Sequence, residues 1–294
     1  MLGHVDRPEY VGGRPHRALT GLVLDYGGYV EVSPVPVRRR QAPTGGLTLI
    51  LSFGPPLRLF GPAGPSVPSS FLAGMHDAAV MTEFVGLQRG VQVNLTPLGG
   101  YVLLGTSMDA LTNRVPHLDE LDVPALSALP EQLADAPDWP ARFARVDAAL
   151  LGLRAAARRL PDPEISWAWR QLRRTDGAAG VAELAAGTGW SRRHLLNRFR
   201  DQVGLTPKIA GRVLRFERAS RLLVPVLADG GPARPVEQSI SMVAADCGYA
   251  DHAHMTREFR ALAGVTPSAY VAEWRAVVPI PSSHEDDAAI PSSP

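Results

Sequence analysis

The chain has 294 residues, of which 45% are hydrophobic and 20% are charged, a balance typical of a folded globular protein. This length accommodates two domains, each with a sizeable core. The formal net charge is only +1, but residues 1–162 carry −1 and residues 163–275 carry +5. A basic C-terminal region beside a near-neutral N-terminal one suits a nucleic-acid-binding domain joined to something else, although +5 also fits an ordinary globular domain.

Several function classes are disfavoured by what the chain lacks. No apolar run approaches the roughly 18–20 residues of a membrane-spanning helix, and Met1–Tyr10 does not have the pattern of a secretory signal. The single cysteine, Cys247, rules out an intrachain disulfide and a cysteine-based zinc site. Histidines are scattered, and no phosphate loop, dinucleotide fingerprint or nucleophile elbow is present. We therefore expect a cytoplasmic protein that is not an enzyme and has no metal site or cofactor.

Residues 1–122 are predicted to form a β-rich domain. Short apolar or alternating runs are separated by glycine and proline breaks, a spacing that indicates a small sandwich or barrel. The Thr-Pro start of Pro97–Leu104 then predicts a helix. The predicted strands are Leu19–Tyr26, Leu47–Phe53, Pro56–Phe60, Ala79–Phe84 and Val91–Leu95.

Residues 123–162 are predicted to be helical. Apolar residues recur at three- and four-residue steps from Trp139 onward, with arginines largely between them. Pro161 and Pro163 end this pattern, because each disfavours helical geometry in the residue before it, and we place a domain boundary there. Beyond a second domain at 163–276, residues 277–294 are rich in Pro, Ser and Ala with an acidic cluster, and are predicted to be a disordered tail.

An internal repeat is the strongest feature of the sequence. Val181–Pro207 and Ile240–Pro267 match at an offset of 60 residues counted from their Gly-(Leu/Val)-Thr-Pro endings, and of 59 residues upstream of the turn. In each copy a short helix (Val181–Ala186; Ile240–Asp246) precedes a glycine that permits a tight turn. A capping residue then opens a second helix. These features predict two helix-turn-helix units, with second helices that enter the major groove of DNA.

The turn and the second helix of each copy contain the residues that define the prediction. Gly189 and Gly248 provide the turns, and Ser191 and Asp251 are the predicted N-caps. Apolar pairs at i and i+4 are expected to hold each second helix on its core. These pairs are Leu195 with Phe199 and Met255 with Phe259.

Both copies resemble the DNA-binding domain of the AraC/XylS family of transcription regulators. The likeness includes Phe199-Arg200 and Phe259-Arg260, the two Thr-Pro endings, the run from Cys247 to Arg260, and the helix Pro207–Leu223 between the units. It implies an α+β chain with an all-α DNA-binding domain at 163–276. The N-terminal half is only loosely similar to the cupin-like barrels of some family members.

The resemblance also implies which side chains face DNA. Arg193 and Arg257 suit guanine and Asn197 suits adenine, whereas Leu196 and Ala253 can only touch a thymine methyl group. Arg198, Arg200 and Arg260 are expected to meet phosphate or an acidic partner rather than a base. The predicted DNA-binding residues are Arg192, Arg193, Leu196, Asn197, Arg200, His252, Ala253, Thr256, Arg257 and Arg260.

Other residues of this domain have structural interpretations. Arginines on the linker helix, Arg212, Arg215 and Arg218, are as well suited to internal pairing with Glu217 and Asp201 as to phosphate binding. Trp190 and Tyr249 are expected in the core, His254 and His194 in packing or phosphate contact, and Cys247 in a buried turn. The long stretch Val224–Gln238 is expected to connect the two units loosely. The first unit is expected to supply most of the sequence discrimination.

The sequence therefore predicts a sequence-specific transcription regulator that binds double-stranded DNA through major grooves. The family resemblance implies a small-molecule effector in the N-terminal domain and a homodimer formed through Trp139–Leu160, with RNA polymerase as a partner if transcription is activated. The alternative is a regulator or architectural protein that senses no ligand. A DNA-repair methyltransferase fused to such a domain would need a reactive cysteine in its own catalytic segment, and Cys247 lies inside the second unit.

Overall fold

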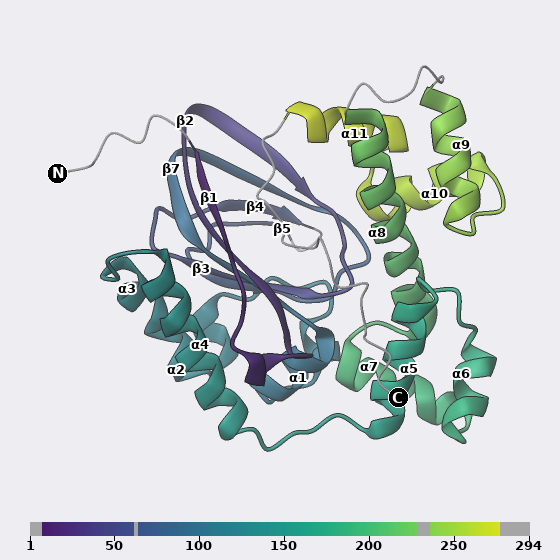
Figure 1. Cartoon of the computed structure of the whole chain (residues 1–294), viewed down its shortest axis with the longest axis horizontal. Coiled ribbons are helices and arrows are strands. Elements are labelled where there is room, and N and C mark those ends of the chain that lie inside the picture. Colours follow the sequence, from purple (N-terminus) through teal and green to yellow (C-terminus); the bar gives the residue numbers. More distant parts are fainter. Residues whose placement is uncertain (1–7, 62–63, 229–235, 277–294) are drawn as a thin grey trace, which may run out of the picture.

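A computed structural model describes residues 8–61, 64–228 and 236–276. In Figure 1 the antiparallel strands form one part of the molecule, and helices α5 to α11 form a second part beside it. This arrangement confirms the predicted α+β class, with a β-rich N-terminal part and a helical C-terminal part. The predicted tail 277–294 lies outside the described residues.

The described strands form a mostly continuous antiparallel sheet in the order β1-β2-β7-β3-β6, with β4 paired to both β5 and β7. The long strands β2 and β7 run side by side, and their register shifts between Ser33 and Val37. Pro34 and Pro36 lie in this interval and cannot donate ladder hydrogen bonds, which accounts for the irregularity. The strands are β1 (Glu9–Gly13), β2 (Val23–Gln41), β3 (Leu47–Ser52), β4 (Arg58–Gly61), β5 (Gly64–Ser66), β6 (Phe71–Ala73) and β7 (Val80–Leu95).

Three of the predicted strands have the wrong boundaries. Ala79–Phe84 and Val91–Leu95 belong to one strand, β7, which continues through the glycines and polar residues that separate the two predicted segments. The predicted strand Leu19–Tyr26 begins as a 3-10 helix, η1 (Arg17–Leu19), and extends much further as β2. Strands β1, β5 and β6 have no counterpart in the prediction, because short strands paired at an edge leave little periodic signal.

Helix α4 (Trp139–Ala155) packs its apolar side against the chain's own sheet. Trp139 lies so close to Gly28 that a Cβ there would stand 2.5 Å from the indole ring, so this contact requires glycine. The Tyr26 hydroxyl donates to Asp147 Oδ1 at 2.8 Å, and Phe143 stacks on the Tyr26 ring. The helix predicted as a linker is therefore packed on the β-rich part over much of its length.

Short helices connect the sheet to the C-terminal part. Helix α1 occupies Pro97–Leu104, the range predicted from the sequence, and Thr96 caps it by accepting from the Gly99 N–H. The other connecting elements are η2 (Met108–Leu111), η3 (Leu118–Leu121), α2 (Pro124–Ser127) and α3 (Leu129–Ala134).

The C-terminal part is wholly helical among its described residues. Helix α8 lies between the two repeat copies, and its Phe216 ring contacts Phe259 at 4.6 Å and Tyr270 at 5.9 Å between centroids. The sequence predicts a loose connection over Val224–Gln238, but α8 continues into this stretch as far as Ala228, and residues 229–235 lie outside the described residues. The helices are α5 (Pro163–Arg174), α6 (Val181–Thr188), α7 (Arg192–Val203), α8 (Pro207–Ala228), α9 (Val236–Asp246), α10 (His252–Ala263) and α11 (Pro267–Ala276).

Candidate nucleic-acid interface

The first unit, α6 and α7, has the construction that the sequence predicts. Gly189 ends α6 with a φ of 71°, a left-handed conformation that favours glycine. Ser191 then caps α7, and its hydroxyl accepts from the His194 N–H at 3.2 Å. Leu195 and Phe199 are fully buried, so one side of α7 is fixed on the core and the opposite side is left outward.

The second unit, α9 and α10, repeats this construction at the matching positions. Gly248 has a φ of 70°, and the Asp251 carboxylate caps α10 by accepting from the His254 N–H at 2.6 Å. Met255 and Phe259 are fully buried. The predicted caps, turns and core positions of both units are thus confirmed.

The residues predicted to face DNA lie on the outward side of α7 and α10. On α7, Arg192, Arg193 and Asn197 are exposed and Leu196 is half-buried. On α10, Ala253 and Arg257 are exposed, whereas His252 and Thr256 are half-buried. Within the described part of the chain, none of the arginines 192, 193, 257 and 260 forms an ion pair.

Two other arginines of α7 are paired with acidic groups. Arg198 donates to both carboxylate oxygens of Asp162, at 2.7 and 2.9 Å, and lies 3.6 Å from Asp201. Its guanidinium holds the pKa of Asp162 below the usual range. Arg200 donates to Asp109, which belongs to the N-terminal part of the chain, at 2.8 Å. The structure therefore gives both residues the acidic partners that the sequence left as one alternative.

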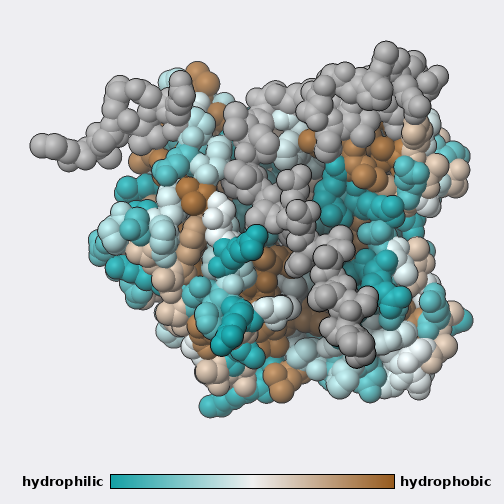
Figure 2. Space-filling model, viewed as in Figure 1, coloured by the Kyte–Doolittle hydropathy of each residue, from teal (hydrophilic) through white to brown (hydrophobic). Residues whose placement is uncertain are grey.

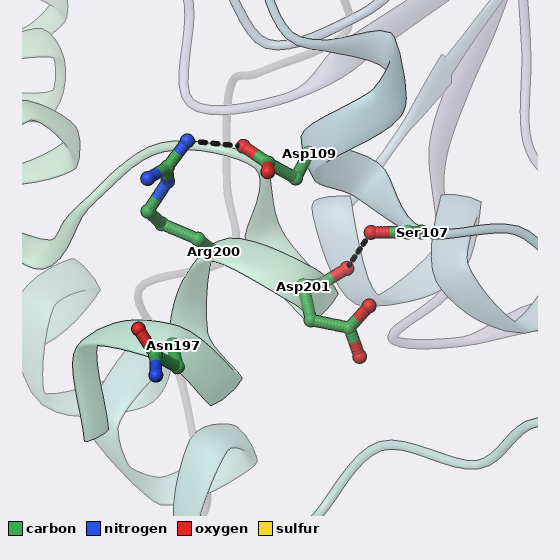
Figure 3. A pocket seen from close by; sticks show the side chains of 5 residues that line it. All are labelled: Ser107, Asp109, Asn197, Arg200 and Asp201. Atoms are coloured by element: carbon green, nitrogen blue, oxygen red, sulfur yellow. Dashed lines mark hydrogen bonds and ion pairs between the residues drawn. The ribbon is translucent and has the colours of Figure 1, made fainter. Parts of the chain in front are cut away.

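Arg200 lies in a shallow hollow between the two parts of the molecule, shown in Figure 3. The hollow encloses about 260 Å³ and is lined only by polar residues. Ser107 donates to the backbone carbonyl of Asp201 at 3.3 Å on the same side. The lining residues are Ser107, Asp109, Asn197, Arg200 and Asp201.

Three arginines of the linker helix α8 have partners within the protein. Arg212 donates to Glu258 on α10 at 2.9 Å, and Arg218 donates to Asp176 at 2.8 Å. The Arg215 guanidinium lies 5.7 Å from the centre of the Tyr249 ring. The sequence predicts internal pairing correctly as one alternative, but the predicted partners are wrong.

The two expected partners of the linker arginines are used elsewhere. Glu217 lies 3.8 Å from Arg173 of α5, and Asp201 is engaged by Arg198. A linear sequence cannot separate these choices, because the pairing of long side chains depends on how the helices cross.

The aromatic residues before α7 and α10, which we call the recognition helices, support these helices by packing. Trp190 stands edge-on to His194 with ring centres 4.4 Å apart, and Tyr249 stands edge-on to His254 at 5.4 Å. Tyr249 is buried as expected, whereas Trp190 is half-buried. Cys247 is buried, and burial raises the pKa of its thiol, which disfavours a reactive thiolate.

On the face shown in Figure 2, hydrophilic residues cover much of the helical part, and apolar residues gather beside α8, on the side of α9. Over the described residues, no group of three or more His, Cys, Asp or Glu side chains could hold a metal ion. None of the described helices combines the length and apolar character needed to cross a bilayer.

Comparison with protein families identifies the C-terminal part. Residues 184–273 match the family described as a helix-turn-helix domain, a range that includes both recognition helices and the linker helix between them. No curated protein matches the chain in sequence.

Several solved structures are similar to the chain at low identity. ToxT from Vibrio cholerae O395 is 11% identical over 86% of this chain and 98% of its own, with a TM-score of 0.46. The same protein bound to (E)-4-(8-methylnaphthalen-1-yl)but-3-enoic acid is 12% identical over 84% and 98%, with a TM-score of 0.48. The C-terminal domain of AraT, a response regulator from Geobacillus stearothermophilus, is 17% identical over 43% and 94%, with a TM-score of 0.32.

Proposed function

We propose that the chain is a DNA-binding transcription regulator rather than an enzyme, and that α7 and α10 read two successive major-groove segments of one duplex. The match of residues 184–273 to a helix-turn-helix domain supports this proposal. The observation that carries this proposal is the repeated construction of the two units. Each recognition helix is capped at its N-terminus and fixed by a fully buried pair, and each leaves an outward face that includes arginine without an ion pair among the described residues.

The linker helix α8 joins the two units and packs against the second one. Arg212 donates to Glu258, and the Phe216 ring contacts Phe259, so α10 lies against the middle of α8. Successive major-groove faces on one side of a duplex lie roughly 34 Å apart. We propose that the packing of both units on α8 holds α7 and α10 over two such faces.

Each residue predicted to face DNA has a proposed role. Arg193 and Arg257 bind guanine O6 and N7, and Asn197 binds adenine N6 and N7, because these pairs match in hydrogen-bond geometry. Leu196 and Ala253 touch thymine methyl groups. The remaining proposed contacts, to phosphate or to neighbouring base edges, are made by Arg192, Arg200, His252, Thr256 and Arg260.

Selection of bound duplexes from a random DNA library tests this function. The full chain should enrich a site with two conserved patches about one helical turn apart. The double variant Arg193→Ala/Arg257→Ala should enrich no such site, while still binding DNA weakly through phosphate contacts. Failure of the wild-type chain to enrich any sequence would overturn the proposal.

We also propose that residues 1–122 bind a small-molecule effector that changes how the two units meet DNA. Support comes from a partly buried polar cluster on the sheet: Tyr10 donates to Glu31 Oε1 at 2.7 Å, and Arg39 lies 2.7 Å from Glu31 Oε2. Burial and the neighbouring Glu31 raise the pKa of Tyr10 to about 12. The alternative is a regulator that senses no ligand, in which this cluster has only a structural role.

Thermal melting of the full chain against a collection of small metabolites separates these two possibilities. A compound that binds the folded state raises the melting temperature in a concentration-dependent way. The same compound should change the affinity for the selected DNA site. If no compound shifts both quantities, a regulator without ligand sensing is favoured.

The proposal includes action in the cytoplasm as a homodimer, with RNA polymerase as a partner if transcription is activated. Self-association through the predicted segment 139–160 would use the outward side of α4, where Ala144, Ala148 and Arg154 are exposed, since its apolar side meets the sheet. Light scattering at micromolar concentration tests the dimer. A monomeric mass both with and without DNA would contradict it.

A further inference from the structure

The short helix η2 lies between the sheet and the first recognition helix. On the sheet side, a Cβ on Gly74 would stand 2.0 Å from the Leu111 carbonyl oxygen, so the two backbones are in direct contact. On the opposite side, a Cβ on Gly204, just after α7, would stand 3.1 Å from the Met108 carbonyl oxygen. Met108 is 1% exposed. The position of η2 is thus fixed by the sheet and by α7 together.

Polar contacts from this region reach α7. Arg200 Nη2 donates to Asp109 Oδ1 at 2.8 Å, and Ser107 Oγ donates to the Asp201 carbonyl at 3.3 Å (Figure 3). The Tyr101 hydroxyl donates to Asp201 Oδ2 at 3.4 Å. We refer to these three contacts as the η2–α7 contact.

The η2–α7 contact lies on the side of α7 that is proposed to face DNA. Arg193, Asn197 and Arg200 are at positions i, i+4 and i+7, which share one face of a helix. Asn197 and Arg200 also line the same hollow. Asp109 therefore places a carboxylate at the C-terminal end of the DNA-facing residues, where a phosphate would otherwise approach Arg200.

We propose that Asp109 competes with a DNA phosphate for Arg200, so that the N-terminal part of the chain lowers the affinity of the first unit for DNA. This inference rests on the proposed function. A carboxylate and a phosphate present similar oxygen acceptors to a guanidinium group, and each repels the other. Both members of the pair are half exposed, so a phosphate can replace Asp109 without first opening a buried contact.

The second unit provides an internal comparison. Arg260, which corresponds to Arg200 in the repeat, is exposed and has no ion pair among the described residues. The N-terminal part does reach this unit, through Arg40, which donates to the Ala263 carbonyl and to Glu273 at 2.8 Å each. These contacts lie at the C-terminal end of α10 and on α11, away from the DNA-facing side chains. Among the described residues, an acidic partner from the N-terminal part thus meets the arginine of the first unit and not that of the second.

The test compares two substitutions that remove the same charge. Asp109→Asn should tighten binding of the full chain to a fixed duplex about two- to fivefold, the range of exposed ion pairs. In a plot of the logarithm of affinity against the logarithm of salt concentration, the slope should also become steeper by up to about one. The control is Asp119→Asn in η3, an exposed carboxylate in the same part of the chain that forms no ion pair among the described residues. Its effect should be smaller than about twofold.

A double-mutant cycle identifies the arginine involved. In an Arg200→Ala background, Asp109→Asn should no longer tighten binding. Arg40→Gln, which breaks the ion pair with Glu273, should not reproduce the gain if the effect is competition for Arg200 rather than general loosening of the two parts. Equal effects of Asp109→Asn and Asp119→Asn, or a gain that persists without Arg200, would overturn the inference.

The outcomes also separate this inference from the proposed function. If the wild-type chain and Asp109→Asn both fail to bind any duplex, the proposed function is wrong, and the pair loses its role with it. If both bind DNA with equal affinity and equal salt dependence, only the competition is wrong.

Discussion

The two helix-turn-helix units have the same internal construction and different surroundings. Both have a left-handed glycine in the turn, a side-chain N-cap and a fully buried apolar pair on the second helix. Helix α7, however, is in contact with the N-terminal part on the side that is proposed to face DNA, through Arg200 and Asp109. Helix α10 is held instead by Arg212 of the linker helix, which donates to Glu258, and by Arg40 of the sheet, which donates to the carbonyl at the end of the helix. Two copies of a repeat can thus keep the same DNA-binding construction, while contacts with the rest of the chain determine which copy is regulated.

The largest expected effect comes from truncating the buried phenylalanine that occupies the same position in each unit. Phe199→Ala and Phe259→Ala should each lower the free energy of unfolding by about 3–5 kcal/mol, because each ring is fully buried. Phe259 also contacts Phe216 and Tyr270, whereas Phe199 packs near Trp169. Urea denaturation followed by circular dichroism measures both losses. A loss below about 1 kcal/mol in either variant would show that its unit is not part of the cooperative core.

The first unit is held by a polar anchor, the hydrogen bonds that join Asp162 to Arg198 and Gln202. The described residues of the second unit contain no counterpart of this kind. Asp162 binds Arg198 and Gln202, and the Gln202 side chain, fully buried, also accepts from the Asp162 N–H at 2.8 Å. Asp162→Ala should cost about 2 kcal/mol of unfolding free energy, because it leaves a buried amide and a half-buried cation without this acceptor. Chemical denaturation at neutral pH measures the loss. An unchanged free energy would show that water replaces the carboxylate without cost.

The same anchor predicts a dependence on pH. Arg198 lowers the pKa of Asp162 in the folded state, so the unfolded chain binds the proton more readily. The stabilisation is therefore complete above the ordinary carboxyl pKa near 3.8 and is lost as the pH falls through the lowered value. The difference in stability between wild type and Asp162→Ala should narrow over that range. A difference that stays constant down to the lowest accessible pH would contradict this cause.

Much of the helical part is predictable from the sequence, because its signals are local. A glycine at a turn and a Ser or Asp before a helix determine conformation over a few residues, so Gly189, Gly248, Ser191 and Asp251 have their expected roles. The sheet is less predictable, since the continuity of β7 depends on pairing with β2 and β3 on either side. Arg200 shows the same limit within the site. Its partner, Asp109, lies 91 residues away in the chain, and no local pattern connects them.

Replacement of the base-reading arginines tests the chemical asymmetry between the units. Arg193→Ala should lower the ratio of affinity for the selected site to affinity for random DNA by about tenfold, the lower part of the range for a bidentate contact with guanine. Arg257→Ala should lower the same ratio by less, if the first unit supplies most of the discrimination. Competition binding at fixed salt measures both ratios. Equal losses on selected and random DNA would show that Arg193 contacts only phosphate.

Removal of the two N-caps has the smallest expected effect. Ser191→Ala and Asp251→Ala each leave a backbone N–H at the start of a recognition helix without its side-chain acceptor. Each should cost about 1 kcal/mol of stability, with the larger loss at Asp251, because a carboxylate also interacts with the helix dipole. Thermal denaturation compares the two. A larger loss of stability in Ser191→Ala than in Asp251→Ala would show that the serine is the stronger cap.

Hydroxyl-radical footprinting of the full chain on its selected site tests whether one chain reads two successive groove segments. Two protected patches are expected on one face of the duplex, roughly one helical turn apart. Arg193→Ala should weaken one patch more than the other, and Arg257→Ala should weaken the opposite one. A single protected patch that either substitution weakens equally would contradict two-segment reading by one chain.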